Sequence, residues 1–139
     1  MGIEELKEKY LPKLEAEELS WEEIPEVMEL LVGIANADED FQDEFEDLTK
    51  TYSFVISDKP ESEHMWIKIE SGKFSAGNGT LKPVDLAFTC DAKCAAGMVS
   101  GAVDSNTAFM KGELKLDGAI SDGMKFQNIM ALFRDVLDI

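Results

Sequence analysis

The stretch that decides the fold is AFMKGELKLDG at residues 108–118, which leads into a long apolar segment at residues 121–137. In the first stretch Leu114 and Leu116 alternate with charged residues, which indicates a strand with one buried face. Gly118 ends this strand. These two segments contain many apolar side chains and very few reactive ones. We therefore interpret their pattern as packing in a core.

Residues 121–137 are predicted to form one helix. Their apolar residues recur at spacings of three and four, which gives a wide apolar stripe along a helix. A stripe of this width has to cover another element. Its members are Phe126, Ile129, Met130, Phe133, Val136 and Leu137.

The middle of the chain has the alternation typical of strands. Four segments show it between residues 51 and 91, and turn residues separate the first three, which predicts an antiparallel meander. Together with residues 113–117 they make five strands, and a short helix is expected at 92–100. We therefore predict an α+β fold with a five-stranded, mainly antiparallel sheet layered with helices. The four segments are 52–57, 65–70, 73–76 and 84–90.

The N-terminal part is predicted to be helical and acidic. A first helix is expected at residues 3–14, with Pro12 at a kink or boundary. Ser20 and Glu23 have the spacing of a capping box, which predicts a second helix running to about residue 35. A third acidic helix follows. We treat residues 1–139 as one domain with an acidic helical N-terminal extension at about 1–40.

Charge excludes one class of function. The net charge of −16 argues against nucleic acid as a partner, because phosphate contacts supply most of that affinity. Residues 1–47 hold 17 acids and 3 lysines, so the acidity belongs to one end. That end is either a solvated surface that aids solubility or a docking surface for a basic protein partner or a dimer contact. It would also repel anionic membranes, which favours transient membrane contact at most.

The sequence contains no pattern typical of an enzyme. Cys90, Cys94 and His64 are too few to build a zinc site, and we expect two small, partly buried thiols in a reducing compartment. We found no nucleophile with its base, no paired acid and base, and no phosphate loop. Catalytic residues, metal and cofactor are therefore all expected to be absent. The chain has no long apolar run and no signal sequence, so a cytoplasmic location is expected.

The run at 108–118, followed by Asp122-Gly123-Met124-Lys125-Phe126-Gln127, resembles the C-terminal half of sterol carrier protein type-2 family domains. The order of the upstream strands agrees, and the resemblance covers about residues 40–137. Two departures are visible. Ser105-Asn106-Thr107 stands where the family commonly has a proline turn, and Lys125-Phe126 stands for a frequent Lys-Leu pair, which alters the shape of a cavity.

The resemblance implies an apolar tunnel between the sheet and the helices, with lipid as its ligand. Methionines suit such a cavity because their side chains are flexible and polarizable, although they could equally fill a core. Gln127 and Lys125 are the polar candidates near its mouth. The expected lipid-binding residues are Met98, Phe109, Met110, Leu116, Ile120, Met124, Phe126, Gln127, Ile129, Met130 and Phe133.

The expected function is non-catalytic binding and intracellular transfer or presentation of a fatty acid, fatty acyl-CoA, sterol or similar hydrophobic ligand. We expect the C-terminal helix to open as a lid. The alternative is a protein-interaction module with a filled core that docks a partner through its acidic N-terminal helices. A third possibility is an accessory domain of lipid metabolism with weak enzymatic activity. The volume of the cavity separates the first two, because a filled core holds no ligand.

Overall fold

The computed structural model describes residues 2–139 and shows six helices and five strands in that range. Two single 3-10 turns, at Trp21–Glu23 and Glu61–Glu63, accompany them. The helices are α1 (Ile3–Glu15), α2 (Ile24–Ala37), α3 (Glu39–Phe45), α4 (Ala92–Ser100), α5 (Ser105–Met110) and α6 (Ile120–Val136). The strands are β1 (Lys50–Ile56), β2 (Met65–Glu70), β3 (Lys73–Asn78), β4 (Leu86–Cys90) and β5 (Lys115–Gly118).

The five strands form one mixed sheet in the order β3-β2-β1-β4-β5. Three neighbouring pairs are antiparallel, and β1 pairs in parallel with β4, where Phe54 lies opposite Phe88. A parallel pair needs a long connection, and here β2, β3 and their loops supply it. The predicted α+β fold with a five-stranded, mainly antiparallel sheet is confirmed.

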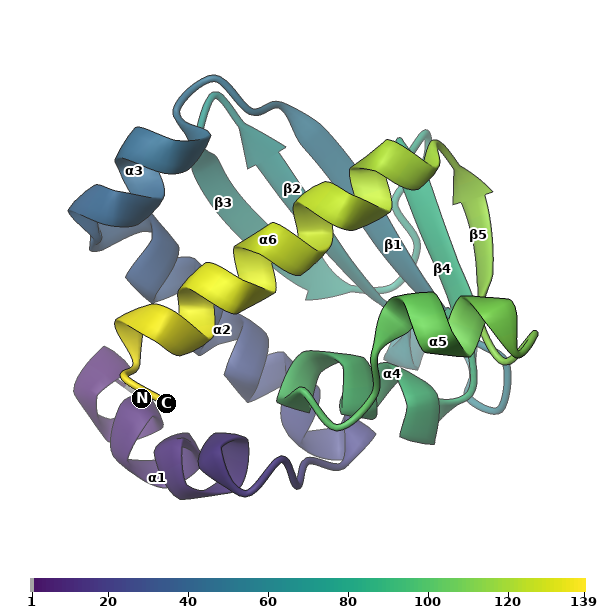
Figure 1. Cartoon of the computed structure of the whole chain (residues 1–139), viewed down its shortest axis with the longest axis horizontal. Helices are drawn as coiled ribbons and strands as arrows, with labels where there is room; N and C mark the ends of the chain where they lie inside the picture. Colours follow the sequence, from purple (N-terminus) through teal and green to yellow (C-terminus); the bar gives the residue numbers. More distant parts are fainter. Residues whose placement is uncertain (1) are drawn as a thin grey trace.

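The helices cover one face of this sheet, and α6 crosses that face diagonally (Figure 1). Alternation places every second side chain of the central strands under the helices, where it is buried. The core therefore lies between the sheet and the helical layer. From the three central strands it takes Tyr52, Phe54, Ile56, Met65, Ile67, Ile69, Leu86, Phe88 and Cys90.

Arg134 ties three helices together near the C-terminus. Its Nη1 donates to the carbonyl oxygen of Leu14, at 3.0 Å, and to that of Ser100, at 2.7 Å. These carbonyls belong to the last turns of α1 and α4, where helices have unpaired acceptors. The end of α6 is thereby fixed to both helices, and the N- and C-termini lie close together (Figure 1).

Asn36 covers part of the exposed edge of the sheet. Its side-chain oxygen accepts from the backbone N–H of Phe74, at 2.8 Å, and its amide nitrogen donates to the carbonyl oxygen of Phe74, at 2.9 Å. Phe74 lies in β3, which is an edge strand. The amide thus takes the position that a neighbouring strand would occupy at this residue.

The N-terminal elements agree with most of the expectations. Pro12 lies inside a continuous α1. The side chain of Glu23 accepts from the N–H of Ser20, at 3.0 Å, so the capping box is present, and α2 ends at Ala37, two residues past the predicted end. The helix α5 had been expected only as a turn. It begins at an N-cap, Asp104, whose carboxylate accepts from the N–H of Asn106.

Candidate functional site

A cavity of about 130 Å³ lies between α4, the segment that follows it, and α6. Its apolar walls come from Met98 of α4, Val103, and Phe126 and Met130 of α6. The polar part of its lining consists of Asp104, Ser105 and Gln127. The cavity is smaller than the roughly 300–1,000 Å³ typical of sites that bury a whole ligand. The tunnel implied by the sequence therefore stays a prediction.

A hydrogen bond crosses the polar side of this cavity. The amide nitrogen of Gln127 donates to the hydroxyl of Ser105 and so joins α6 to the first residue of α5. Gln127 and Ser105 are both half-buried, whereas Met98, Phe126 and Met130 are buried. This bond therefore bridges α5 and α6 on the polar side of the cavity.

Aromatic rings form the wall where α6 meets the sheet. The ring centroid of Phe126 lies 5.1 Å from that of Phe88, 5.4 Å from that of Phe54 and 5.7 Å from that of Tyr52. Phe54 and Phe88 stack at 5.1 Å across the parallel strand pair. Rings at these separations and tilts attract one another, so this wall is rigid.

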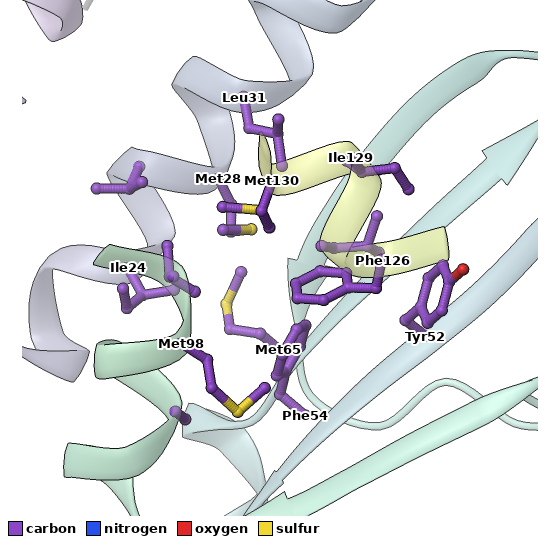
Figure 2. Packing of buried hydrophobic residues seen from close by; sticks show 14 of the residues in the cluster. Ile24, Met28, Leu31, Tyr52, Phe54, Met65, Met98, Phe126, Ile129 and Met130 are labelled. Carbon is purple, nitrogen blue, oxygen red and sulfur yellow. The ribbon is translucent and has the colours of Figure 1, made fainter. Parts of the chain in front are cut away.

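Two methionines, Met98 and Met130, line the cavity, and two more are buried nearby. Figure 2 shows Met28, Met65, Met98 and Met130 gathered between α2, α4, α6 and the sheet. All four are buried, with 7% exposure or less. Each comes from a different element, namely α2, β2, α4 and α6. An unbranched thioether chain changes rotamer at small cost, so Met98 and Met130 can make room for a ligand more readily than the ring of Phe126, which contacts the other aromatic rings.

The residues expected to bind lipid fall into three groups. Met98, Phe126, Gln127 and Met130 line the cavity, and Ile129 and Phe133 are buried in the core on the same helix. Leu116 is half-buried in β5. Phe109, Met110, Ile120 and Met124 lie on the surface, with exposed fractions from 42% to 84%. The role of all eleven in lipid binding stays a prediction.

Three lining residues were missed by sequence reasoning: Val103, Asp104 and Ser105. The available signal was the sequence Asp104-Ser105-Asn106-Thr107, which has a good N-cap residue directly before a short helix. The same stretch occupies the place of the family's proline turn, so the departure noted in the sequence falls at the cavity itself.

The two cysteines and the single histidine are buried or hydrogen-bonded within the fold. Cys90 and Cys94 are free, and both are buried where partial burial was predicted. Burial raises the pKa of both thiols. Nε2 of His64 lies 3.0 Å from the carbonyl oxygen of Ile56, an acceptor, so this nitrogen carries the proton. Within residues 2–139 no group of three potential metal ligands comes together.

Comparison with known proteins identifies the family of this chain. The model of the SCP-2 sterol transfer family matches residues 31–131, which is well over half of the sequence. The chain belongs to the SCP-2 sterol transfer family. The match begins within α2, so α1 precedes it. No match was found among curated protein sequences. In residues 2–139 no helix combines the length and the apolar character needed to cross a membrane.

Solved structures of SCP-2 domains have the same fold. The sterol carrier protein domain 2 of Helicoverpa armigera has a TM-score of 0.56 and 20% identity, covering 76% of this chain and 84% of that one. Palmitated SCP2L2 from Aedes aegypti has a TM-score of 0.53 and 14% identity, covering 75% and 90%. The inverting sec-alkylsulfatase Pisa1 from a Pseudomonas species scores 0.60 at 20% identity. That match covers 77% of this chain but only 16% of the sulfatase, so the shared domain is a small part of that enzyme.

Proposed function

We propose that this chain is a non-catalytic lipid carrier that holds one acyl chain or similar apolar ligand in the cavity between α4 and α6. The observation that carries this proposal is the cavity itself, where Phe126, packed against other aromatic rings, lies beside the buried methionines Met98 and Met130. Membership of the SCP-2 sterol transfer family supports lipid as the ligand class.

The ligand must widen the cavity as it enters, because about 130 Å³ is too small for a long acyl chain. The aromatic wall is held by several ring contacts, so the room comes from Met98 and Met130, with Met28 and Met65 behind them. Burying a methylene stabilises by roughly 0.8 kcal/mol, so a 16-carbon chain gains on the order of 12 kcal/mol before ordering and association costs. That gain is sufficient for binding without a covalent step.

The polar lining favours one class of head group. Asp104, Ser105 and Gln127 offer hydrogen bonds, and the lining contains one carboxylate and no basic side chain. The phosphates of an acyl-CoA would meet a like charge there. Among the expected ligands, we therefore place a lipid with an uncharged polar head, or a protonated fatty acid, ahead of an acyl-CoA.

We propose that movement of α5 opens the entrance to the cavity. The helix α6 is held at its end by the hydrogen bonds of Arg134. The helix α5 has only six residues, and beside the cavity the Gln127–Ser105 hydrogen bond joins it to α6. Breaking one hydrogen bond costs far less than lifting a helix of 17 residues from its core. The movement expected of the C-terminal helix is therefore reassigned to α5.

Native mass spectrometry of the freshly purified protein, followed by organic extraction, tests the proposal. The expected result is a stoichiometric co-purified lipid, or uptake of added palmitate by the apo protein. Met130→Trp should abolish uptake because the indole fills the cavity. Leu132→Trp should keep it, because Leu132 lies on the same helix but does not line this cavity. A clean apo mass without uptake would refute the proposal.

A second candidate function, docking of a basic protein, has one observation in its favour. A groove between α3 and α6 is lined by the carboxylates of Asp40, Asp43, Glu44 and Asp135. Such a groove attracts a basic partner by charge. A binding partner whose affinity is lost in Asp43→Asn/Glu44→Gln and kept in Met130→Trp would support this function instead.

A further inference from the structure

We propose that the corner formed by α5, β5 and the first turns of α6 is the surface through which this protein contacts a lipid bilayer, and that it prefers an uncharged, zwitterionic bilayer. The inference deepens the proposed function and rests on it, since it names the place where the carried lipid is exchanged. We define this corner as residues 105–125.

The corner collects the exposed large apolar side chains. Among residues 2–139, the large hydrophobic side chains that stay exposed are Phe109 at 42%, Met110 at 84%, Ile120 at 60% and Met124 at 59%. A globular protein normally scatters such residues singly, so their concentration in one short stretch indicates a contact surface.

The four side chains flank a single strand. Phe109 and Met110 end α5, four residues before β5 begins, while Ile120 and Met124 lie in the first turns of α6, just after β5. A strand of four residues spans about 13 Å. Figure 1 shows α5, β5 and the start of α6 together along one side of the molecule. Both pairs can therefore reach one bilayer surface together.

The corner is electrically neutral in a strongly acidic chain. Residues 105–125 contain three lysines and three acids. One of these acids, Asp122, is buried and paired with Lys50, so the exposed part is slightly basic. Lys111, Lys115 and Lys125 are exposed and can reach lipid phosphates beside the apolar side chains. This part of the surface can approach a bilayer without repulsion.

The rest of the chain sets the lipid preference. Residues 1–47 hold 17 acids and 3 lysines, and this end would be repelled by an anionic bilayer. The same charge disfavours a second copy of the chain as the occupant of the corner. A zwitterionic bilayer avoids both costs. It also offers an interfacial layer into which methionine and phenylalanine side chains can insert.

The corner lies next to the entrance of the cavity. Ser105, at the start of α5, and Gln127, three residues after Met124, make the hydrogen bond that bridges α5 and α6 on the polar side of the cavity. A ligand that leaves the cavity when this hydrogen bond breaks would pass into the bilayer bound at the corner. Docking of Phe109 and Met110 in a bilayer would also pull on α5, the element that has to move.

Vesicle flotation at low ionic strength tests the inference on the full chain. Wild-type protein should float with phosphatidylcholine vesicles, and adding phosphatidylserine should lower the bound fraction until salt is raised. Met110→Ser/Met124→Ser should weaken binding at least about fivefold. Lys115→Glu, exposed on β5, should weaken binding to phosphatidylcholine vesicles, whereas Lys73→Glu, exposed on the opposite edge strand β3, should not.

Three results would overturn the inference: no flotation of the wild-type protein, equal flotation of the double methionine variant, or a wild-type dimer in sedimentation velocity that this variant dissociates. The last would assign the corner to a second copy. Flotation does not depend on a ligand in the cavity, so the test separates the two proposals. Palmitate uptake without flotation defeats the docking surface alone, and flotation without uptake defeats the carrier alone.

Discussion

The carboxylate of Asp122 lies 3.2 Å from the ammonium group of Lys50, and this ion pair joins the first turn of α6 to the beginning of β1. Asp122 is only 4% exposed, and the hydroxyl of Tyr52 donates to its backbone oxygen at 3.0 Å. The start of α6 is therefore fixed to the sheet, just as Arg134 fixes its end. These two attachments support the proposal that α5, rather than α6, moves when a ligand enters.

Removing the cation of this pair should destabilise the protein. Lys50→Met leaves the buried carboxylate of Asp122 without its nearest charge partner and should lower the free energy of unfolding by about 1–2 kcal/mol, since Lys50 is partly solvated. Urea denaturation measures the change. Adding Asp122→Asn to Lys50→Met should recover part of the loss, and a double variant less stable than Lys50→Met would contradict this explanation.

Shortening the aromatic wall should change which ligands fit. Phe126→Leu restores the residue pair that the family often has at this place and enlarges the cavity beside Met98 and Met130. It should cost about 1–2 kcal/mol of stability and shift the ligands taken up from a mixture of fatty acids toward longer chains. Native mass spectrometry gives the chain-length distribution. Phe133→Leu is the matched control, because Phe133 is buried on the same helix but does not line the cavity.

Both tyrosines should lose their phenolic protons at a higher pH than a tyrosine exposed to solvent. Burial, with the hydrogen bond to Glu26, raises the pKa of Tyr10 to about 12, and burial near Asp122 raises that of Tyr52 further. A raised pKa means that the folded state keeps a proton which the unfolded chain loses near pH 10. The contribution of the two tyrosines to stability should be constant below pH 10 and fall between pH 10 and 12. Phenolate absorbance, followed with the melting temperature, tests this, and a tyrosine titrating near pH 10 in the folded protein would refute it.

The two thiols should be inert while the protein is folded. Burial raises the pKa of Cys90 and Cys94, which keeps both as thiols at neutral pH, and both side chains are shielded from reagents. Alkylation by iodoacetamide at pH 8 should be at least about 100-fold slower than in urea, as read by intact mass. Rapid modification of the folded protein at either cysteine would show that the strand end opens.

Local patterns predicted most of the fold. Alternation located β2 to the residue, and the helix expected at residues 92–100 has the bounds of α4. The parallel pairing of β1 with β4 was not predictable in this way, because it depends on which distant strands share a register. The helix α5 was missed for another reason. Six residues carry less than two turns of periodicity, so only its N-cap could have indicated it.

The cavity was less predictable than the fold. Spacing along α6 identified Phe126, Gln127 and Met130 as neighbours on one helix, and the structure places them around one cavity. Spacing could not say that Ile120 and Met124, on the same apolar helix, stay exposed. Their exposure depends on which side of the helix the sheet covers. Asp122, in the same first turn, contacts Lys50 of β1, whereas Ile120 and Met124 stay exposed.

The amide of Asn36, bonded to both backbone groups of Phe74, has a consequence for crowding. Protein molecules bound to one vesicle would be at high local concentration. Under these conditions unpaired edge strands of different molecules can hydrogen-bond to each other and start aggregation. At Phe74 the chain has already satisfied the donor and acceptor that such a partner would need. Asn36 thus limits aggregation in the setting where a lipid carrier is most concentrated.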